Sequence, residues 1–96
     1  MPRLRALVAV TVAINRLRIE VEDLLDRIAE CHEELRLAAA TRARRNPPAR
    51  WEEVVAANFA VGHWGEELER YRRMLAEVEE ELATAYDLRL EFTMLL

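Results

Sequence analysis

The stretch LVAVTVAINRLRIEVEDLLDRIAECHEELRLA, residues 7–38, determines the fold. Apolar or small side chains recur in it every seven residues, in two series that lie three residues apart. This is the a and d pattern of helices that pack along a narrow seam. It therefore predicts a long helix with one apolar stripe. The a series is Leu7, Ile14, Val21, Ile28 and Leu35, and the d series is Val10, Leu17, Leu24, Cys31 and Ala38.

A second stretch, residues 54–85, repeats the same pattern on the other side of a Pro-Pro break. Two such helices separated by a short break favour a hairpin in which the two stripes face each other. The predicted fold class is all-α, a long antiparallel helical hairpin resembling a coiled coil. Its a series is Val54, Val61, Leu68, Leu75 and Leu82, and its d series is Ala57, Trp64, Tyr71, Val78 and Ala85.

The break Asn46-Pro47-Pro48 sets the domain organisation. A residue before proline is pushed out of the helical region, so the first helix must end near this point. We predict one hairpin domain over residues 1–96, with a helix over about 3–45 and a loop over 46–49. A second helix then covers about 50–88, and a C-terminal tail follows over 89–96 because Arg89 interrupts the a series.

Three local alternatives stay open at this level. Gly62 and Gly65 each cost a helix about 1 kcal/mol relative to Ala. They could make room for the Trp64 indole, break the second helix at 62–65, or form a cleft. The alternating residues 88–94 are also compatible with a strand or an extended tail.

Composition excludes several classes of protein. Hydrophobic residues make up 52% of the chain and charged residues 33%, which fits a folded protein with long exposed helices. The net charge is −4 and all fourteen cations are Arg. Nucleic-acid-binding domains usually carry a basic excess, so this balance does not favour that class.

The single cysteine and the hydropathy pattern bear on location. Cys31 occupies a d position, which predicts a buried structural thiol and no disulfide within the chain. The longest apolar run, residues 6–14, is far shorter than the roughly 20 residues of a membrane span. We expect a cytoplasmic, unprocessed protein without a membrane partner.

Apolar residues outside the two stripes indicate an interface. A monomeric hairpin leaves them uncovered, and exposed patches of this kind usually mark a contact with another molecule. They gather mainly at the end of the hairpin that carries both termini, which predicts a homodimer in the form of a four-helix bundle. The predicted oligomer interface is Val8, Val12, Ile19, Leu25, Leu88, Leu90 and Met94.

Candidate chemistry is sparse. Di-iron bundles need Glu-x-x-His motifs, and the positions three before His32 and His63 are both Ala. The chain has no Ser and no Gly-rich loop, so the usual nucleophiles and phosphate cradles are missing. We therefore predict no catalytic residues, no metal site, no cofactor and no enzymatic activity.

The predicted function is a non-enzymatic protein–protein interaction module that acts as a dimer. Adaptors, chaperones and small inhibitors or accessory proteins, including those of phages and mobile elements, have this general character. The protein partner is not identified by the sequence. The alternative is a nucleic-acid-associated factor, because arginines and aromatics can hold phosphates and stack on bases. The residues predicted to contact a partner or nucleic acid are Arg42, Arg44, Arg45, Arg50, Trp51 and Phe59.

Overall fold

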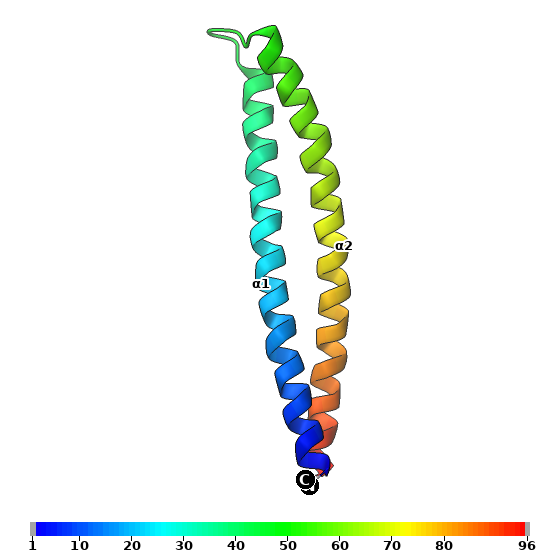
Figure 1. Cartoon of the computed structure of the whole chain (residues 1–96). Helices are drawn as coiled ribbons and strands as arrows, with labels where there is room; N and C mark the ends of the chain where they lie inside the picture. The colour runs from blue at the N-terminus through cyan, green and yellow to red at the C-terminus, as the bar shows by residue number, and fades with distance from the viewer. Residues whose placement is uncertain (1, 96) are drawn as a thin grey trace. The chain divides into compact units, whose positions relative to one another are not determined.

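The computed structural model describes residues 2–95 and contains two helices, α1 (Pro2–Ala43) and α2 (Trp51–Leu95). A single loop joins them (Figure 1). The prediction of an all-α helical hairpin is confirmed. Pro2 is tolerated in the first turn of α1 because the backbone N–H that proline lacks would have no partner there.

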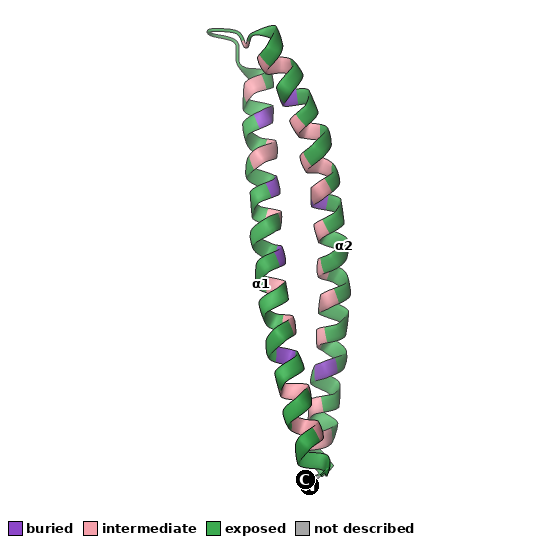
Figure 2. Cartoon of the chain, in the orientation of Figure 1, coloured by how far each residue is buried: buried purple, intermediate pink, exposed green. Residues whose placement is uncertain are grey.

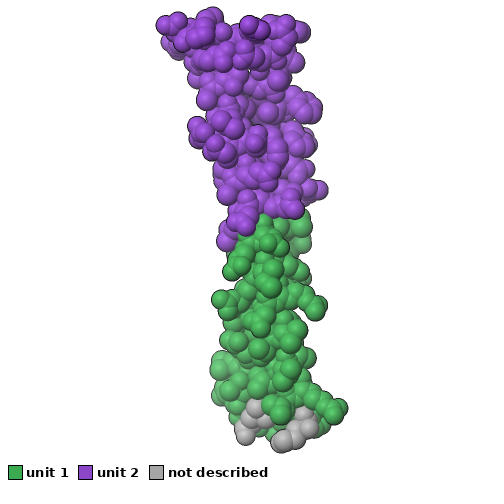
Figure 3. All heavy atoms as spheres, turned by 60° about the vertical axis from the view of Figure 1, so that its left-hand side comes forward, with its two compact units in different colours: residues 1–24, 74–96 green, residues 25–73 purple. Residues whose placement is uncertain are grey.

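The hairpin divides into two compact units, which Figure 3 colours separately. The terminal unit comprises residues 1–24 and 74–96, and the loop unit comprises residues 25–73. Each unit contains a part of α1 and a part of α2, so neither helix belongs to one unit alone. The prediction of a single domain stays a prediction.

The core of each unit is the predicted seam. All seven buried apolar residues occupy a or d positions of the two series, and the other series positions are half-buried. Ile14 is 1% exposed and Cys31 is 0% exposed. Figure 2 shows the buried positions on the sides of the helices that face each other. The buried residues are Ile14, Leu24, Cys31, Ala38, Ala57, Leu68 and Ala85.

Polar contacts show the antiparallel pairing within each unit. In the terminal unit, Arg3 Nη1 donates a hydrogen bond of 3.0 Å to the carbonyl oxygen of Leu95. In the loop unit, the Arg27 guanidinium lies 6.0 Å from the centre of the Tyr71 ring. These contacts join residues far apart in sequence, as a hairpin requires.

The break at residues 62–65, one of the three alternatives, does not occur. α2 is continuous there, and neither glycine has a positive φ. The seam residues Val61, Trp64 and Leu68 on either side are buried or half-buried, and their packing holds the helix across the two glycines. The idea that the glycines make room for Trp64 is also wrong, because a Cβ added at either position meets no atom within 4 Å.

The C-terminal tail predicted over residues 89–96 is helical throughout its described part, as far as Leu95. Two residues explain the difference. Phe92 is half-buried at the next d position and extends the seam. Arg89, at the next a position, is also half-buried, and its guanidinium lies 5.0 Å from the centre of the Tyr86 ring. The long methylene stem of an arginine can pack at a seam position while its charge reaches solvent.

The loop is longer than the predicted 46–49 because α1 ends at Ala43 and α2 begins at Trp51. The backbone N–H of Arg44 still donates to the Thr41 carbonyl, at 3.3 Å, and closes the last turn. An isolated bridge between Arg45 and Pro48 follows, and the Asn46–Pro47 peptide bond is cis.

Candidate interaction surfaces

An apolar row runs along the outer side of α1 in the terminal unit. It consists of Leu4, Val8, Val12 and Ile19, which are between 48% and 59% exposed. At 100° per residue, the last three lie about 120–160° around the helix from the buried Ile14. This part of α1 therefore presents apolar side chains on two sides, and the hairpin covers only one of them.

The charges along residues 2–19 are positive, whereas Glu20, Glu22 and Asp23 follow directly after Ile19. Residues 2–19 contain Arg3, Arg5, Arg16 and Arg18 and no acidic residue, since the first carboxylate is Glu20. All four arginines are exposed. Arg5 and Arg16 lie on the same side of α1 as the row, and with it they form a surface that we call the basic apolar face.

The part of α2 in the terminal unit has the opposite charge. Its apolar residues Leu88, Leu90 and Met94 are exposed, and Met94 with Leu95 and Glu91 lines a shallow hollow of about 320 Å³. Six of its side chains are acidic, and a second hollow of about 410 Å³ lies among Glu77, Glu80, Glu81 and Thr84. The terminal unit thus carries a basic apolar segment of α1, residues 2–19, and an acidic apolar segment of α2.

The predicted interface residues are all exposed, but they do not all belong to the terminal unit. Val8, Val12, Ile19, Leu88, Leu90 and Met94 do, whereas Leu25 falls in the loop unit. Leu25 lies outside the exposed row formed by Val12 and Ile19, because its helical angle is about 120–140° away from theirs. The seven residues therefore do not form one patch, and the six of the terminal unit are kept as the candidate interface.

Among the arginines near the loop, Arg44 makes side-chain contacts that hold the loop together. Arg44 Nη2 pairs with Glu53 Oε2 at 2.9 Å, and Arg44 Nε donates to the Pro47 carbonyl at 3.1 Å. The other Glu53 oxygen accepts the backbone N–H of Arg50 at 3.3 Å, the reciprocal contact of a capping box at the start of α2. Arg44 thereby ties the end of α1 to the start of α2.

Arg42, Arg45 and Arg50 are exposed beside the loop. Together with Arg44 and Trp51 they are the candidate residues of the nucleic-acid alternative, which stays a prediction. The engagement of Arg44 with Glu53 leaves it less available for a phosphate.

A second apolar row lies on the outer side of α2 in the loop unit. Trp51 and Phe59 are each 75% exposed, and Val55 between them is also exposed. The spacing of four residues places all three about 120–160° from the buried Ala57. From the sequence, Trp51 and Phe59 were predicted as contact residues but not as one row with Val55. A comparison of helical angles would have found it.

A shallow hollow of about 310 Å³ continues this row. It is lined by Asn58, Phe59, Gly62, His63 and Glu66. The rings of Phe59 and His63 are parallel within 3°, with centroids 6.1 Å apart, and the edge of His63 faces Trp64 at 5.0 Å. Gly62 is one of the lining residues, and a larger side chain at this position would extend into the hollow.

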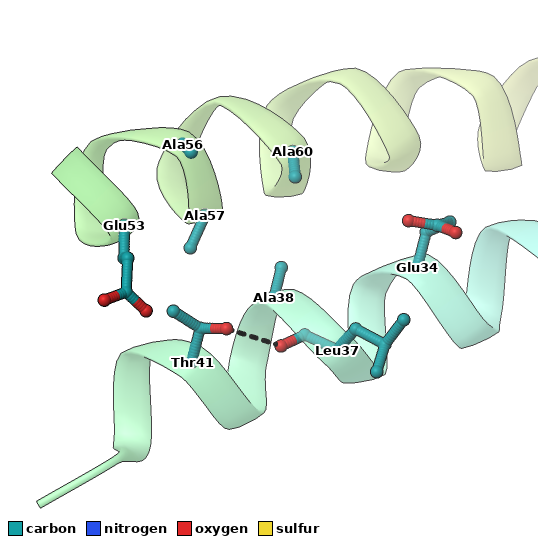
Figure 4. A pocket seen from close by; sticks show the side chains of 8 residues that line it. All are labelled: Glu34, Leu37, Ala38, Thr41, Glu53, Ala56, Ala57 and Ala60. Atoms are coloured by element: carbon teal, nitrogen blue, oxygen red, sulfur yellow. Dashed lines mark hydrogen bonds between the residues drawn. The ribbon is translucent and has the colours of Figure 1, made fainter. Parts of the chain in front are cut away.

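Small residues line a fourth depression, on the seam side of the loop unit. Figure 4 shows Ala38 and Ala57 extending towards each other from the two helices. With Glu34, Leu37, Thr41, Glu53, Ala56 and Ala60 they line a shallow groove of about 320 Å³. Thr41 Oγ1 donates to the Leu37 carbonyl at 3.2 Å, so this hydroxyl already has a partner within its own helix. The groove follows from alanine at two facing seam positions.

Cys31 is a buried free thiol, as predicted. Burial raises the pKa of its thiol above the usual value, and the nearby carboxylates of Glu67 and Glu30 raise it further. A raised pKa keeps the sulfur protonated at neutral pH, and the thiolate is the reactive form. The position therefore contributes packing.

We expect Cys31 to react with a disulfide reagent about 100-fold more slowly in the native protein than in urea, because reaction requires local opening.

The raised pKa of the Cys31 thiol also makes stability depend on pH, because the unfolded state releases the thiol proton at a lower pH than the folded state does. Stability is then unaffected below the ordinary thiol pKa and falls as pH rises from that value to the raised one. Reagent kinetics and urea titrations between neutral and alkaline pH measure both effects. A Cys31→Ala variant, which should lack the alkaline loss, is the control.

The two histidines do not meet. His32 Nε2 lies 3.5 Å from Arg72 Nη2, whereas His63 stacks on Phe59. Among residues 2–95, no group of three or more His, Cys, Asp or Glu side chains is arranged to hold a metal ion. Within the same residues, neither helix combines the length and apolar character that a membrane crossing needs.

Comparison with known proteins adds no further assignment. No protein-family model, no curated protein and no solved structure matches the chain significantly.

Proposed function

We propose that the chain is a non-enzymatic interaction module that forms a homodimer through its terminal unit. The basic apolar face carries this proposal, because Val8, Val12 and Ile19 lie exposed on the side of α1 away from the seam. A helix with apolar residues on two sides is normally buried on both. A second copy would cover this side and complete a four-helix bundle. The cytoplasmic location expected from the sequence is part of the same proposal.

Charge complementarity supports a second copy as the partner. Residues 2–19 of α1 carry Arg5, Arg16 and Arg18 and no carboxylate, although Glu20, Glu22 and Asp23 follow, whereas the α2 part of the terminal unit has six acidic side chains and one arginine. In a two-fold symmetric dimer, α1 of one copy can lie against α2 of the other, and the same contact then occurs twice. Basic side chains would meet acidic ones at the rim of both contacts, and complementary potentials of this kind favour the correct pairing.

Sedimentation at micromolar concentration tests the dimer. The native chain should sediment as a dimer, and Val12→Glu or Ile19→Glu should raise the dissociation constant about 100-fold, because each places an unpaired charge in an apolar contact. Ala29→Glu is the matched control, since Ala29 is exposed on the same helix outside the row. It should leave the dimer intact.

A native chain that sediments as a monomer of 11.2 kDa would refute the dimer. Equal effects of Val12→Glu and Ala29→Glu would refute the assigned surface. Circular dichroism of each variant distinguishes a lost interface from a lost fold, because the monomer should remain helical.

A further inference from the structure

The outer side of α2 in the loop unit carries large aromatics that the chain itself does not use. Trp51 and Phe59 are each 75% exposed, and neither belongs to the seam. Single exposed apolar residues are common on protein surfaces and need no explanation. Here, however, Trp51, Val55 and Phe59 form a row with a spacing of four residues, which is the pattern of helix faces that anchor a partner. Trp in particular is enriched among residues that dominate binding energy.

Gly62 extends this row and has no role within the described chain. Its backbone conformation is ordinary for a helix, and a Cβ built on it meets no atom within 4 Å. It therefore costs helix stability without giving the hairpin closer packing in return. What it provides is the hollow beside Phe59 and Glu66.

The walls of the hollow match one kind of side chain. The Phe59 ring, which lies parallel to the His63 ring with centroids 6.1 Å apart, is one wall, and a guanidinium can stack on an aromatic ring. The Glu66 carboxylate is exposed at the rim and takes part in none of the ion pairs formed by residues 2–95. A long side chain with an apolar stem and a cationic end, such as arginine, would satisfy both.

The charges along the aromatic row are mostly negative, like that of Glu66. Residues 51–69 contain five acidic side chains and no arginine, and Arg50 and Arg70 directly flank this stretch. Glu53 and Glu67 are paired with Arg44 and Arg70, respectively. A partner helix with an apolar stripe and arginines on its flanks would be complementary both to the aromatic row and to the remaining carboxylates.

We propose that this face of α2 binds an arginine-bearing amphipathic helix of a different protein, with one arginine seated in the Gly62 hollow between Phe59 and Glu66. The chain has a basic apolar helix of its own at residues 2–19, but the dimer proposed above covers it. The choice of a different protein over a second copy rests on that proposed function. The binding face itself shares no residue with the dimer interface.

Titration with synthetic peptides tests the proposal directly. The probe is an amphipathic peptide of about five helical turns, with leucine along one face and arginine on both flanks. A peptide with glutamate in place of arginine and a peptide of residues 2–19 are run beside it. In NMR spectra of the isotope-labelled native protein, the arginine peptide should shift the indole N–H signal of Trp51 and leave the indole N–H signal of Trp64 in place. Sedimentation of the same samples reports the dimer independently.

Four variants locate the contact. Phe59→Ala, Glu66→Gln and Gly62→Leu should each weaken binding of the arginine peptide about tenfold, because they remove the ring, the charge and the hollow. Gly65→Ala is the matched control, since it fills open space outside the hollow and should leave the affinity unchanged within about twofold.

Equal binding of the arginine and glutamate peptides would overturn the proposal. Binding of the arginine peptide that is unchanged in Phe59→Ala, Glu66→Gln and Gly62→Leu would also overturn it. Stronger binding of the residue 2–19 peptide than of the arginine peptide would also overturn it, because the occupant would then be a second copy. Loss of the dimer with retained, variant-sensitive binding of the arginine peptide would refute the proposed function alone.

Discussion

Ile14→Asp is expected to lower the free energy of unfolding by about 3–5 kcal/mol, the cost of leaving an unpaired charge buried. Ile14 is 1% exposed and lies at the a position of the seam in the terminal unit. The nearest seam positions on the same helix, Val10, Leu17 and Val21, are apolar, so the new carboxylate would lie among apolar side chains. Natural domains are stable by only about 5–15 kcal/mol, so the effect is a large fraction of the total.

Urea unfolding followed by circular dichroism measures this change. Ala29→Asp is the control, because it makes a similar chemical change at an exposed position of the same helix. It should cost only the lower helix propensity of aspartate, about 0.5 kcal/mol. Similar losses for the two variants would mean that the seam is not the core of the protein.

Replacing both glycines of α2 by alanine should stabilise the protein by about 2 kcal/mol, about 1 kcal/mol for each site. Alanine restricts the unfolded chain and favours the helix, and here it meets no obstacle. Neither glycine has a positive φ, and an added Cβ has no atom within 4 Å at either position. For a domain of this length, such a gain raises the melting temperature by roughly 8–16 °C.

Thermal unfolding of Gly62→Ala, Gly65→Ala and the double variant measures the effect. The gains should add, because each substitution acts on its own backbone position and shares no partner with the other. A loss of stability at either site would contradict the open space around it and revive the view that the glycines make room for Trp64. An Ala60→Gly variant should show the opposite sign and calibrates the scale.

The seam of the hairpin could be read from the sequence because burial in a two-helix structure follows one rule. A residue is buried only if it faces the other helix, and the seven-residue repeat identifies those positions. Ile14, Leu24 and Leu68 were therefore predictable one by one, as was the burial of Cys31. The stop near Pro47 followed from backbone sterics alone.

The errors arose where the residue type gave a misleading signal. Arg89 was read as the end of the seam because it is charged, whereas its stem packs there and Phe92 continues the series. The two glycines left a break open as one alternative because glycine has a low helix propensity. The packing of the flanking seam residues outweighs this cost of about 2 kcal/mol. Propensity is a local quantity, and the length of α2 is decided by contacts with α1.

The exposed surfaces were only partly predictable for a different reason. A sequence shows that Val12 and Ile19 lie off the seam, but not how much of each side chain the other helix covers. Trp51 was assigned to the loop arginines because it is adjacent to them in sequence. Its position at the first turn of α2 instead places it in line with Val55 and Phe59.

The regular seam makes the length of the hairpin adjustable in fixed steps. In the terminal unit, Arg3 lies beside Leu95, so residues whose numbers add up to about 98 are opposite each other. Removing residues 14–20 together with 78–84 would delete one heptad from each helix and bring every remaining a and d position back into phase. Removing either segment alone would shift the partners of the terminal unit by two turns. Related hairpins of different length should therefore differ by paired heptads, one in each helix.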